Sequence, residues 1–257
     1  MPLKTAASVD APESATMHIS ADTLIAHAKE QLSAEQVMRL NQLENSISRG
    51  DVKNQQLEVY HQLSHFWKDT ARLFEPYAWY EAEAARLENS EKSLTFAAHL
   101  LLNNLQGEGN PALKQWKATQ AKDLFERSLK LNPDNDSSAV GLGACYLFGN
   151  IAENPMEGII KVKNVLDKDS TNVFALMTLG HGSTLSGQSD KAIARFEQVH
   201  RLQPQNLEAI LSLADIYEKK GNTELAISWY KKSLPLIAIP ALSAEVERRI
   251  NDLNKKQ

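Results

Sequence analysis

Apolar residues recur at helical spacing toward the C-terminus of the chain, and the pattern repeats after 34 residues. Each half of the repeating unit shows a single apolar stripe, so neither predicted helix can bury that stripe alone. The corresponding positions are Gly180 with Ala214, Gly187 with Gly221, Ala192 with Ala226, and Phe196 with Tyr230. A recurrence of this length and residue type predicts a stack of helix–turn–helix units, an architecture used more for binding or scaffolding than for catalysis.

One complete unit covers Val173–Asn206. The small residues Gly180 and Ala192 allow its two helices to approach closely, and Phe196 fills the space where the next unit stacks. In these residues the chain resembles the tetratricopeptide repeat family, and Leu207–Ala238 matches the same motif without a gap. The resemblance implies an all-α fold, a right-handed superhelix (α-solenoid) built from helix–turn–helix repeats.

Looser copies of the unit continue upstream, with longer turns at Asn103–Asn110 and Asn150–Pro155. We expect Ser20 to cap a helix over Leu24–Leu32, and Ser33 with Gln36 to form a capping box for a second helix. The predicted divisions are a disordered leader at 1–19, an N-terminal helical cap at 20–52, a degenerate repeat 1 at 53–90, repeat 2 with a long turn at 91–135, repeat 3 at 136–172, repeat 4 at 173–206, repeat 5 at 207–240 and a C-terminal capping helix at 241–257.

Composition narrows the classes of function. The net charge is −4 with acidic and basic residues interspersed, which argues against a nucleic-acid partner and against an anionic membrane surface. No run approaches the roughly 20 apolar residues that span a bilayer, so the chain as given predicts no direct membrane contact. The single cysteine, Cys145, excludes an intramolecular disulfide and a thiolate metal cluster, and its surroundings predict a buried packing role. No cofactor is expected.

The compartment stays open at this level. A chain without disulfides is compatible with the cytoplasm and does not exclude the cell envelope. The chain is similar to bacterial envelope-associated repeat proteins that carry one N-terminal membrane helix. The similarity lies in the N-terminal helices, the segment Leu87-Glu88-Asn89-Ser90-Glu91-Lys92 and the degenerate repeats that follow it. That similarity implies the periplasmic side of the envelope if an upstream anchor was removed, and the opening residues would then be a linker.

The family resemblance also implies which side chains face a ligand, because the first helix of each repeat lines the concave surface. Carried onto this sequence, the candidate peptide-binding residues are Val140, Ala144, Leu147, Phe148, Phe174, Met177, His181, Leu211, Asp215 and Glu218. The strip grades from apolar to acidic, which favours an apolar peptide with a basic end near Asp215 and Glu218. Burial of Phe174 and Met177 in the core is the alternative interpretation.

One familiar function of the family is disfavoured by the same positions. Chaperone-binding members hold a C-terminal carboxylate with a clamp of Lys, Asn and Arg. The corresponding places here are Val140, Ala144, Thr178, Glu208 and Ser212. Because none is cationic, we expect no carboxylate clamp.

Histidines offer a weaker candidate site. His61 and His65 are four residues apart and share a predicted helix face, so with His99 they could ligate a metal. The chain has no HExxH arrangement and no cysteine partner for them, and a solvated or hydrogen-bonded histidine face is the competing interpretation.

The sequence therefore predicts a non-catalytic protein- or peptide-binding scaffold. A structural or assembly role, through another copy of the chain or an envelope complex, is the alternative. Metal binding or an enzyme activity through the histidine face is the distant third. The partner's identity and the oligomeric state stay open.

Overall fold

The computed structural model describes residues 19–47, 53–151 and 155–255, and within them every regular element is a helix. The α-helices are α1 (Ala21–Lys29), α2 (Ala34–Ile47), α3 (Lys53–His65), α4 (Phe74–Glu88), α5 (Glu91–Asn103), α6 (Pro111–Leu131), α7 (Asp136–Phe148), α8 (Met156–Lys168), α9 (Val173–Leu185), α10 (Ser189–Leu202), α11 (Leu207–Lys219), α12 (Thr223–Ser233) and α13 (Pro240–Asn254). Two short elements join them, the π-helix η1 (Phe66–Ala71) and the 3₁₀-helix η2 (Leu234–Leu236). None of the described helices combines the length and apolar character that a bilayer span requires.

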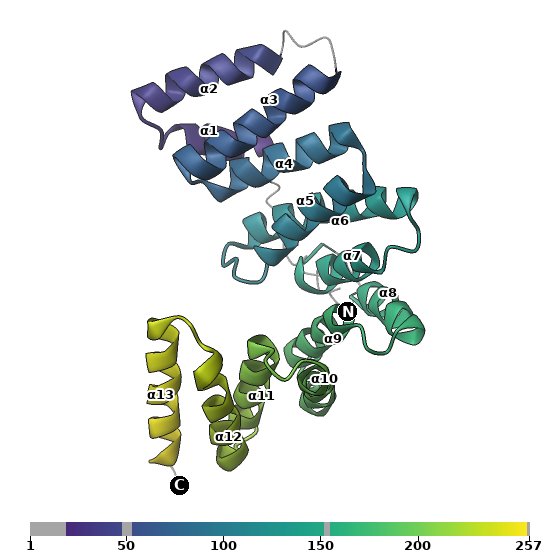
Figure 1. Cartoon of the computed structure of the whole chain (residues 1–257), viewed down its shortest axis with the longest axis vertical. Coiled ribbons are helices and arrows are strands. Elements are labelled where there is room, and N and C mark those ends of the chain that lie inside the picture. The colour runs from purple at the N-terminus through teal and green to yellow at the C-terminus, as the bar shows by residue number, and fades with distance from the viewer. Residues whose placement is uncertain (1–18, 48–52, 152–154, 256–257) are drawn as a thin grey trace, which may run out of the picture.

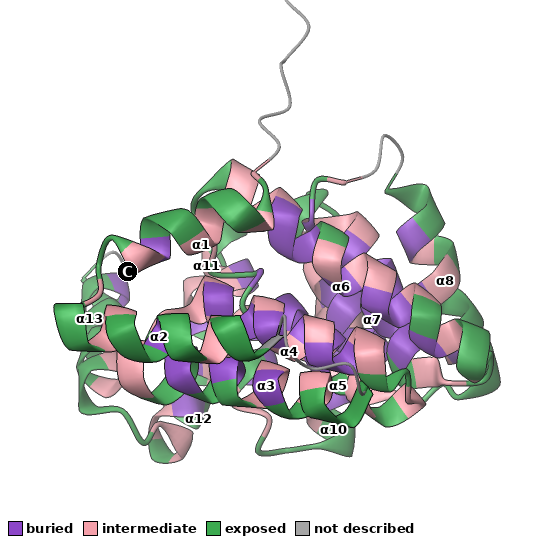
Figure 2. Cartoon of the chain, turned by 90° about the horizontal axis from the view of Figure 1, so that it is seen from above, coloured by how far each residue is buried: buried purple, intermediate pink, exposed green. Residues whose placement is uncertain are grey.

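Consecutive helices pack in pairs, α3 with α4, α5 with α6, α7 with α8, α9 with α10 and α11 with α12, and each pair stacks on the next. The stack curves, and its two ends lie on the left of Figure 1. First helices of successive pairs also touch directly, as α5 does α7 and α7 does α9. The all-α solenoid predicted from the sequence is confirmed. Figure 2 shows that many residues along α6 and α7 are buried.

Glycine sets how closely the paired helices approach. A Cβ at Gly180 of α9 would lie 2.6 Å from the Phe196 ring of α10. Between the second and third pairs, a Cβ at Gly141 of α7 would lie 2.2 Å from the ring of Phe125 of α6. Both distances are far below a van der Waals contact, so a larger residue would force the helices apart. The aromatic side chain therefore occupies the space that the glycine leaves free.

Helix ends follow recognisable chemistry. Asn172 accepts a hydrogen bond from the Ala175 amide at the start of α9, and Asn206 accepts one from the Ala209 amide at the start of α11. Such side-chain caps satisfy amides that have no partner within the helix. Gly187 follows α9 with φ of +72°, a left-handed conformation that glycine adopts without steric cost.

Both ends of the stack are covered by additional helices. At the N-terminal end, the side-chain caps predicted for the first two helices are present. Ser20 accepts a hydrogen bond from the Thr23 amide, and Ser33 exchanges two hydrogen bonds with Gln36. The first helix begins at Ala21 and ends at Lys29, earlier than predicted, because the following amides form tight turns instead of continuing the helix. At the other end, α13 packs on α12 and buries Val246, Ile250 and Leu253. The predicted leader lies outside the described residues up to residue 18, as do residues 152–154 of the predicted turn.

The long turn between α5 and α6 is fixed by a buried lysine. Lys117 of α6 is 1% exposed, and its Nζ donates at 2.6 Å to Asn104 Oδ1 and at 2.6 Å to Glu108 Oε2. A third contact joins Nζ to Glu75 Oε1 of α4 at 3.0 Å. Buried charges persist in proteins when they are paired in this way. The interaction holds residues 104–110 against the body of the stack.

Candidate functional site

A groove runs along the first helices of the second to fifth helix pairs. Its larger part has a volume of about 560 Å³ and is lined by Leu102, Asn103, Gln106, Ala144, Phe148, Val173, Phe174, Met177, Thr178, His181, Asn206 and Glu208. A smaller part of about 240 Å³ shares Gln106, Phe148 and His181 with it and adds Lys114, Leu147, Thr184 and Leu185. Because the two hollows share walls, we treat them as one feature and call it the inner groove.

The floor of the inner groove is apolar. Phe148 and Phe174 are half-buried and pack against the core cluster around Leu142 and Ala144. Met177 is 8% exposed and belongs to the core beneath α9 and α10. Leu185 at the end of α9 is 73% exposed, a large apolar side chain left to solvent. The floor thus combines residues that hold the fold together with residues that are open to a ligand.

One wall of the inner groove carries a histidine–carboxylate pair. His181 Nε2 of α9 lies 2.8 Å from Glu208 Oε1 of α11. This hydrogen bond lowers the pKa of Glu208 and outweighs the opposing effect of its burial. The His181 ring rests edge-on against Phe196, with ring centroids 5.1 Å apart. The pair therefore links two adjacent repeats across the groove.

His99 lies close to the same region but is committed to packing. Its Nε2 lies 2.8 Å from Ser137 Oγ, and its ring contacts Phe125 and Phe174. Burial lowers the pKa of His99, because the imidazolium form loses hydration there.

The histidine face considered as a metal site is not assembled. His65 Nδ1 lies 3.3 Å from Asp69 Oδ2 on its own turn, and His61 lines a separate hollow beside Phe96 of α5. His99 faces Ser137 instead. Over residues 19–47, 53–151 and 155–255, no three His, Cys, Asp or Glu side chains are grouped to hold a metal ion.

Six of the sequence candidates meet in the inner groove: Ala144, Leu147, Phe148, Phe174, Met177 and His181. Val140 does not, because it is 0% exposed. It packs with Val162 and Val165 of α8 and with Ala175 and Leu179 of α9. Its position within the repeat suggested a ligand-facing side chain, but the tight stacking of α7 between α8 and α9 encloses it.

The acidic candidates are engaged by the C-terminal helices. The Tyr230 hydroxyl lies 2.5 Å from Asp215 Oδ1 and 2.8 Å from Glu218 Oε2. Arg249 Nε of α13 donates to Glu218 Oε2 at 2.7 Å. Burial and then these two carboxylates raise the pKa of Tyr230, which keeps the phenol protonated as their donor. Leu211 is half-buried in the same cluster as α13.

Sequence reasoning missed the contribution of the second repeat. Leu102 and Asn103 end α5, Gln106 stands in the long turn, and Lys114 opens α6. The sequence could have predicted the contribution of Leu102, because the apolar stripe of this helix continues to that residue. The sequence could not have predicted the position of Gln106, because a turn of irregular length does not continue the helical spacing from which side-chain directions are inferred. Lys114 is the one cation in the described lining of the groove.

The positions that correspond to the carboxylate clamp carry no cation in the sequence. Val140 and Ala144 are buried, Thr178 donates to the carbonyl of Phe174 one turn earlier, and Glu208 is acidic.

Comparison with known proteins agrees with this architecture. Residues 184–235 match the sequence profile of the family described as tetratricopeptide repeat. No protein of curated function matches the chain by sequence. A tetratricopeptide repeat protein of Parabacteroides merdae is similar in structure, with 13% identity, a TM-score of 0.59, and coverage of 91% of this chain and 87% of that one.

Two further solved structures are similar. PilW, a type IV pilus biogenesis factor, has 18% identity and a TM-score of 0.55, with 80% of this chain and 87% of PilW covered. A thermophilic tetratricopeptide repeat protein of Thermus thermophilus has 16% identity and a TM-score of 0.54, with 79% and 98% covered. At these identities the similarity concerns the fold.

Proposed function

We propose that this chain, in which residues 184–235 match the tetratricopeptide repeat family, is a non-catalytic scaffold that binds a protein partner by holding an apolar segment in the inner groove. The observation that carries this proposal is the continuity of the hollow. About 560 Å³ and about 240 Å³ adjoin at Phe148 and His181. An apolar floor with a few polar groups on its walls is typical of peptide grooves built from helices.

The binding energy would come from apolar side chains that the groove leaves uncovered. Burying a fully exposed leucine contributes about 1.5–3 kcal/mol. Leu185 is 73% exposed, and the partly buried rings of Phe148 and Phe174 add the area that remains exposed along the groove. A ligand segment with apolar residues on one face would cover these three side chains together.

The charges at the groove orient the ligand. Glu208 has a lowered pKa and is ionised at neutral pH, and its side chain stays 58% exposed beside His181, so it favours a basic group of the partner. Lys114 stands at the smaller part of the hollow and favours an acidic group there. This arrangement replaces the basic end expected beside Asp215 and Glu218, since Tyr230 and Arg249 already bind those carboxylates.

The proposal is tested by selecting binders from a library of random short peptides and measuring their affinity by fluorescence anisotropy. Leu185→Glu places a charge in the groove at a side chain that is 73% exposed, so the fold should tolerate it. Loss of the apolar contact should weaken binding by at least about tenfold. Substituting Met177 is unsuitable, because it is 8% exposed and would disturb the core.

Leu225→Glu is the matched control. Leu225 is 40% exposed and lies on α12, outside the described lining of the groove. Binding that survives Leu225→Glu and is lost in Leu185→Glu supports the proposal. A library that yields no binder, or equal losses in both variants, contradicts it. Sedimentation equilibrium tests the alternative that the groove binds a second copy of the chain. A dimer that dissociates when Leu185→Glu is introduced would assign the groove to that second copy.

A further inference from the structure

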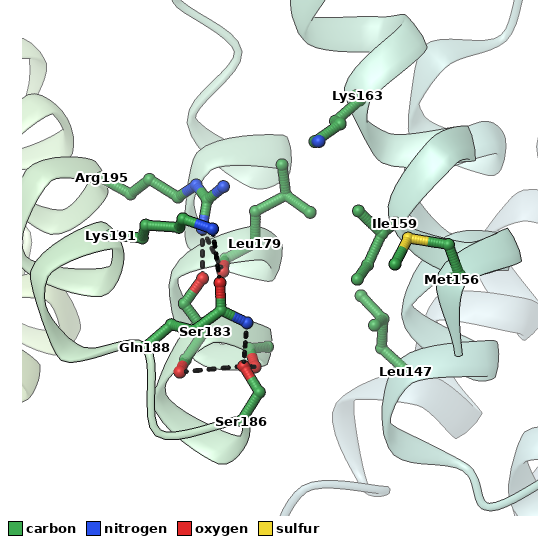
Figure 3. A pocket seen from close by; sticks show the side chains of 11 residues that line it. Leu147, Met156, Ile159, Lys163, Leu179, Ser183, Ser186, Gln188, Lys191 and Arg195 are labelled. Carbon is green, nitrogen blue, oxygen red and sulfur yellow. Dashed lines mark hydrogen bonds between the residues drawn. The ribbon is translucent and has the colours of Figure 1, made fainter. Parts of the chain in front are cut away.

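A second hollow, here called the side pocket, lies between the third and fourth helix pairs. Its volume is about 130 Å³, and it shares only Leu147 with the inner groove. Figure 3 shows Lys191 and Arg195 of α10 on one side of it, with Ile159, Met156 and Leu147 on the other. Lys163 of α8 is the third cation of the lining. None of the described residues that line the side pocket is acidic.

The three cations have no carboxylate partner in the described part of the chain. Lys191 Nζ donates at 2.6 Å to the neutral amide of Gln188. The neighbouring acids are occupied elsewhere, since Asp190 pairs with Lys220 at 2.6 Å and Glu157 pairs with Lys161 at 3.6 Å. Three positive charges around one hollow repel one another, and an anion placed among them would relieve that repulsion.

Arg195 is held in position by neutral acceptors. Its Nη1 donates to the carbonyl oxygen of Leu179 at 3.1 Å and to the Ser183 hydroxyl. Its Nε and Nη2 donors bond to nothing within the described residues. Burial lowers the pKa of Arg195, and no carboxylate offsets that loss of hydration. A guanidinium fixed at one end with donors left over presents a ready fork for an oxyanion.

The first turn of α10 adds to the positive potential. Gln188, which precedes the helix, caps no amide with its side chain. Both Gln188 and Lys191 line the side pocket, so the start of the helix faces it. Helix N-termini stabilise nearby negative charge through their free amides and aligned dipoles.

We propose that the side pocket binds a small oxyanion, a carboxylate or a phosphate, carried on a short aliphatic stem. The anion sits between Arg195, Lys191 and Lys163, and the stem lies against Ile159 and Leu147. The available volume corresponds to about four water molecules of about 30 Å³ each, which limits the stem to a few carbon atoms within the pocket. The site is separate from the function assigned to the inner groove, and neither depends on the other.

The test is a titration of the isotopically labelled protein followed by NMR, at a constant chloride concentration. The probes are butyrate, its neutral isostere butanamide, and ethyl phosphate. Butyrate or ethyl phosphate should shift the amide signals of Gly182, Ser183 and Gln188 and should saturate. Butanamide should bind at least about tenfold more weakly, because it cannot form the charge-assisted hydrogen bonds. The tighter of the two anions identifies the oxyanion.

Variants locate the site. Lys163→Gln removes an exposed cation from the side pocket and should weaken anion binding by about tenfold. Lys168→Gln is the matched control, since it removes the same charge from the same helix at a residue outside the lining, where it faces Asp134 and Asp136. Arg195→Gln should weaken binding further.

Butyrate and butanamide of equal affinity would overturn the proposal, as would equal losses in Lys163→Gln and Lys168→Gln. Anion-induced shifts confined to the inner groove would also overturn it. Lys163→Gln keeps the test decisive if Arg195→Gln fails to fold, because the Lys163 side chain bonds to nothing in the described structure and is exposed.

Discussion

Lys117→Met should destabilise the protein by about 3 kcal/mol, since removing one partner of a buried ion pair leaves the other charge uncompensated. Lys117 is 1% exposed and binds Glu108, Glu75 and Asn104 within 3.0 Å. Methionine keeps most of the volume and loses all three interactions. The estimate stands at the low end of the usual 3–5 kcal/mol, because Glu108 Oε1 keeps its hydrogen bond from the Asn110 amide at 2.7 Å.

The effect should concentrate in the turn that Lys117 holds. The stability of a stacked array is distributed along its length, so the loss of one contact is best measured in the residues next to that contact. Hydrogen–deuterium exchange should therefore show lost protection at residues 104–110, which include Gln106 of the inner groove. Thermal unfolding should shift down by about 6–12 °C, at about 2–4 °C per kcal/mol for a chain of this size.

Lys122→Met on the same helix is the control. Lys122 pairs with Glu126 at 2.9 Å, and its side chain is 32% exposed, so its loss should cost less than about 1 kcal/mol. Adding Glu108→Gln to Lys117→Met should recover part of the lost stability, because the stranded carboxylate is removed. The reasoning is refuted if Lys117→Met is no worse than Lys122→Met, or if the double variant recovers nothing.

The same contact predicts a pH dependence. The hydrogen bond from Lys117 lowers the pKa of Glu108 below its ordinary value of 4.5. A lowered carboxyl pKa contributes stability that is fully present above pH 4.5 and is lost as the pH falls through the folded-state pKa. The difference in unfolding free energy between wild type and Lys117→Met should thus shrink on acidification.

Three further outcomes are expected. Gly180→Ala should destabilise the fourth helix pair by about 1–3 kcal/mol in denaturant unfolding, since its Cβ would meet the Phe196 ring at 2.6 Å, and a stabilised variant would contradict this packing. Cys145 is buried, which raises the pKa of its thiol to about 12, so it should react with a disulfide reagent only as fast as the protein opens. Asn172→Ala should cost about 1 kcal/mol, because the Ala175 amide loses its cap, and an unchanged midpoint would remove that role.

The sequence predicts the fold because its signals are local and periodic. Gly180, Phe196 and Gly187 stand where two closely packed helices and their turn require them. Asparagine and serine caps mark helix starts in the same direct way. The π-helix at Phe66–Ala71 carries no comparable signal, since a one-turn change of hydrogen bonding leaves the helical periodicity almost intact.

The candidate site is only partly predictable, because it depends on contacts between repeats. Position within the repeat singles out Phe148 and His181, and both side chains line the inner groove. It fails for Val140, which the neighbouring helices enclose. The buried Lys117 is beyond a local reading as well, since Glu75 lies 42 residues earlier in the chain and the other partners come from an irregular turn.

The affinity of a selected apolar peptide for wild type, Leu185→Glu and Leu225→Glu tests the central claim most directly. Leu185 is the most exposed large apolar side chain of the inner groove, and Leu225 is a comparable side chain outside it. If the inner groove is the binding surface, Leu185→Glu should weaken the affinity for the peptide by at least about tenfold, and Leu225→Glu should not. An affinity that Leu185→Glu leaves unchanged would contradict it.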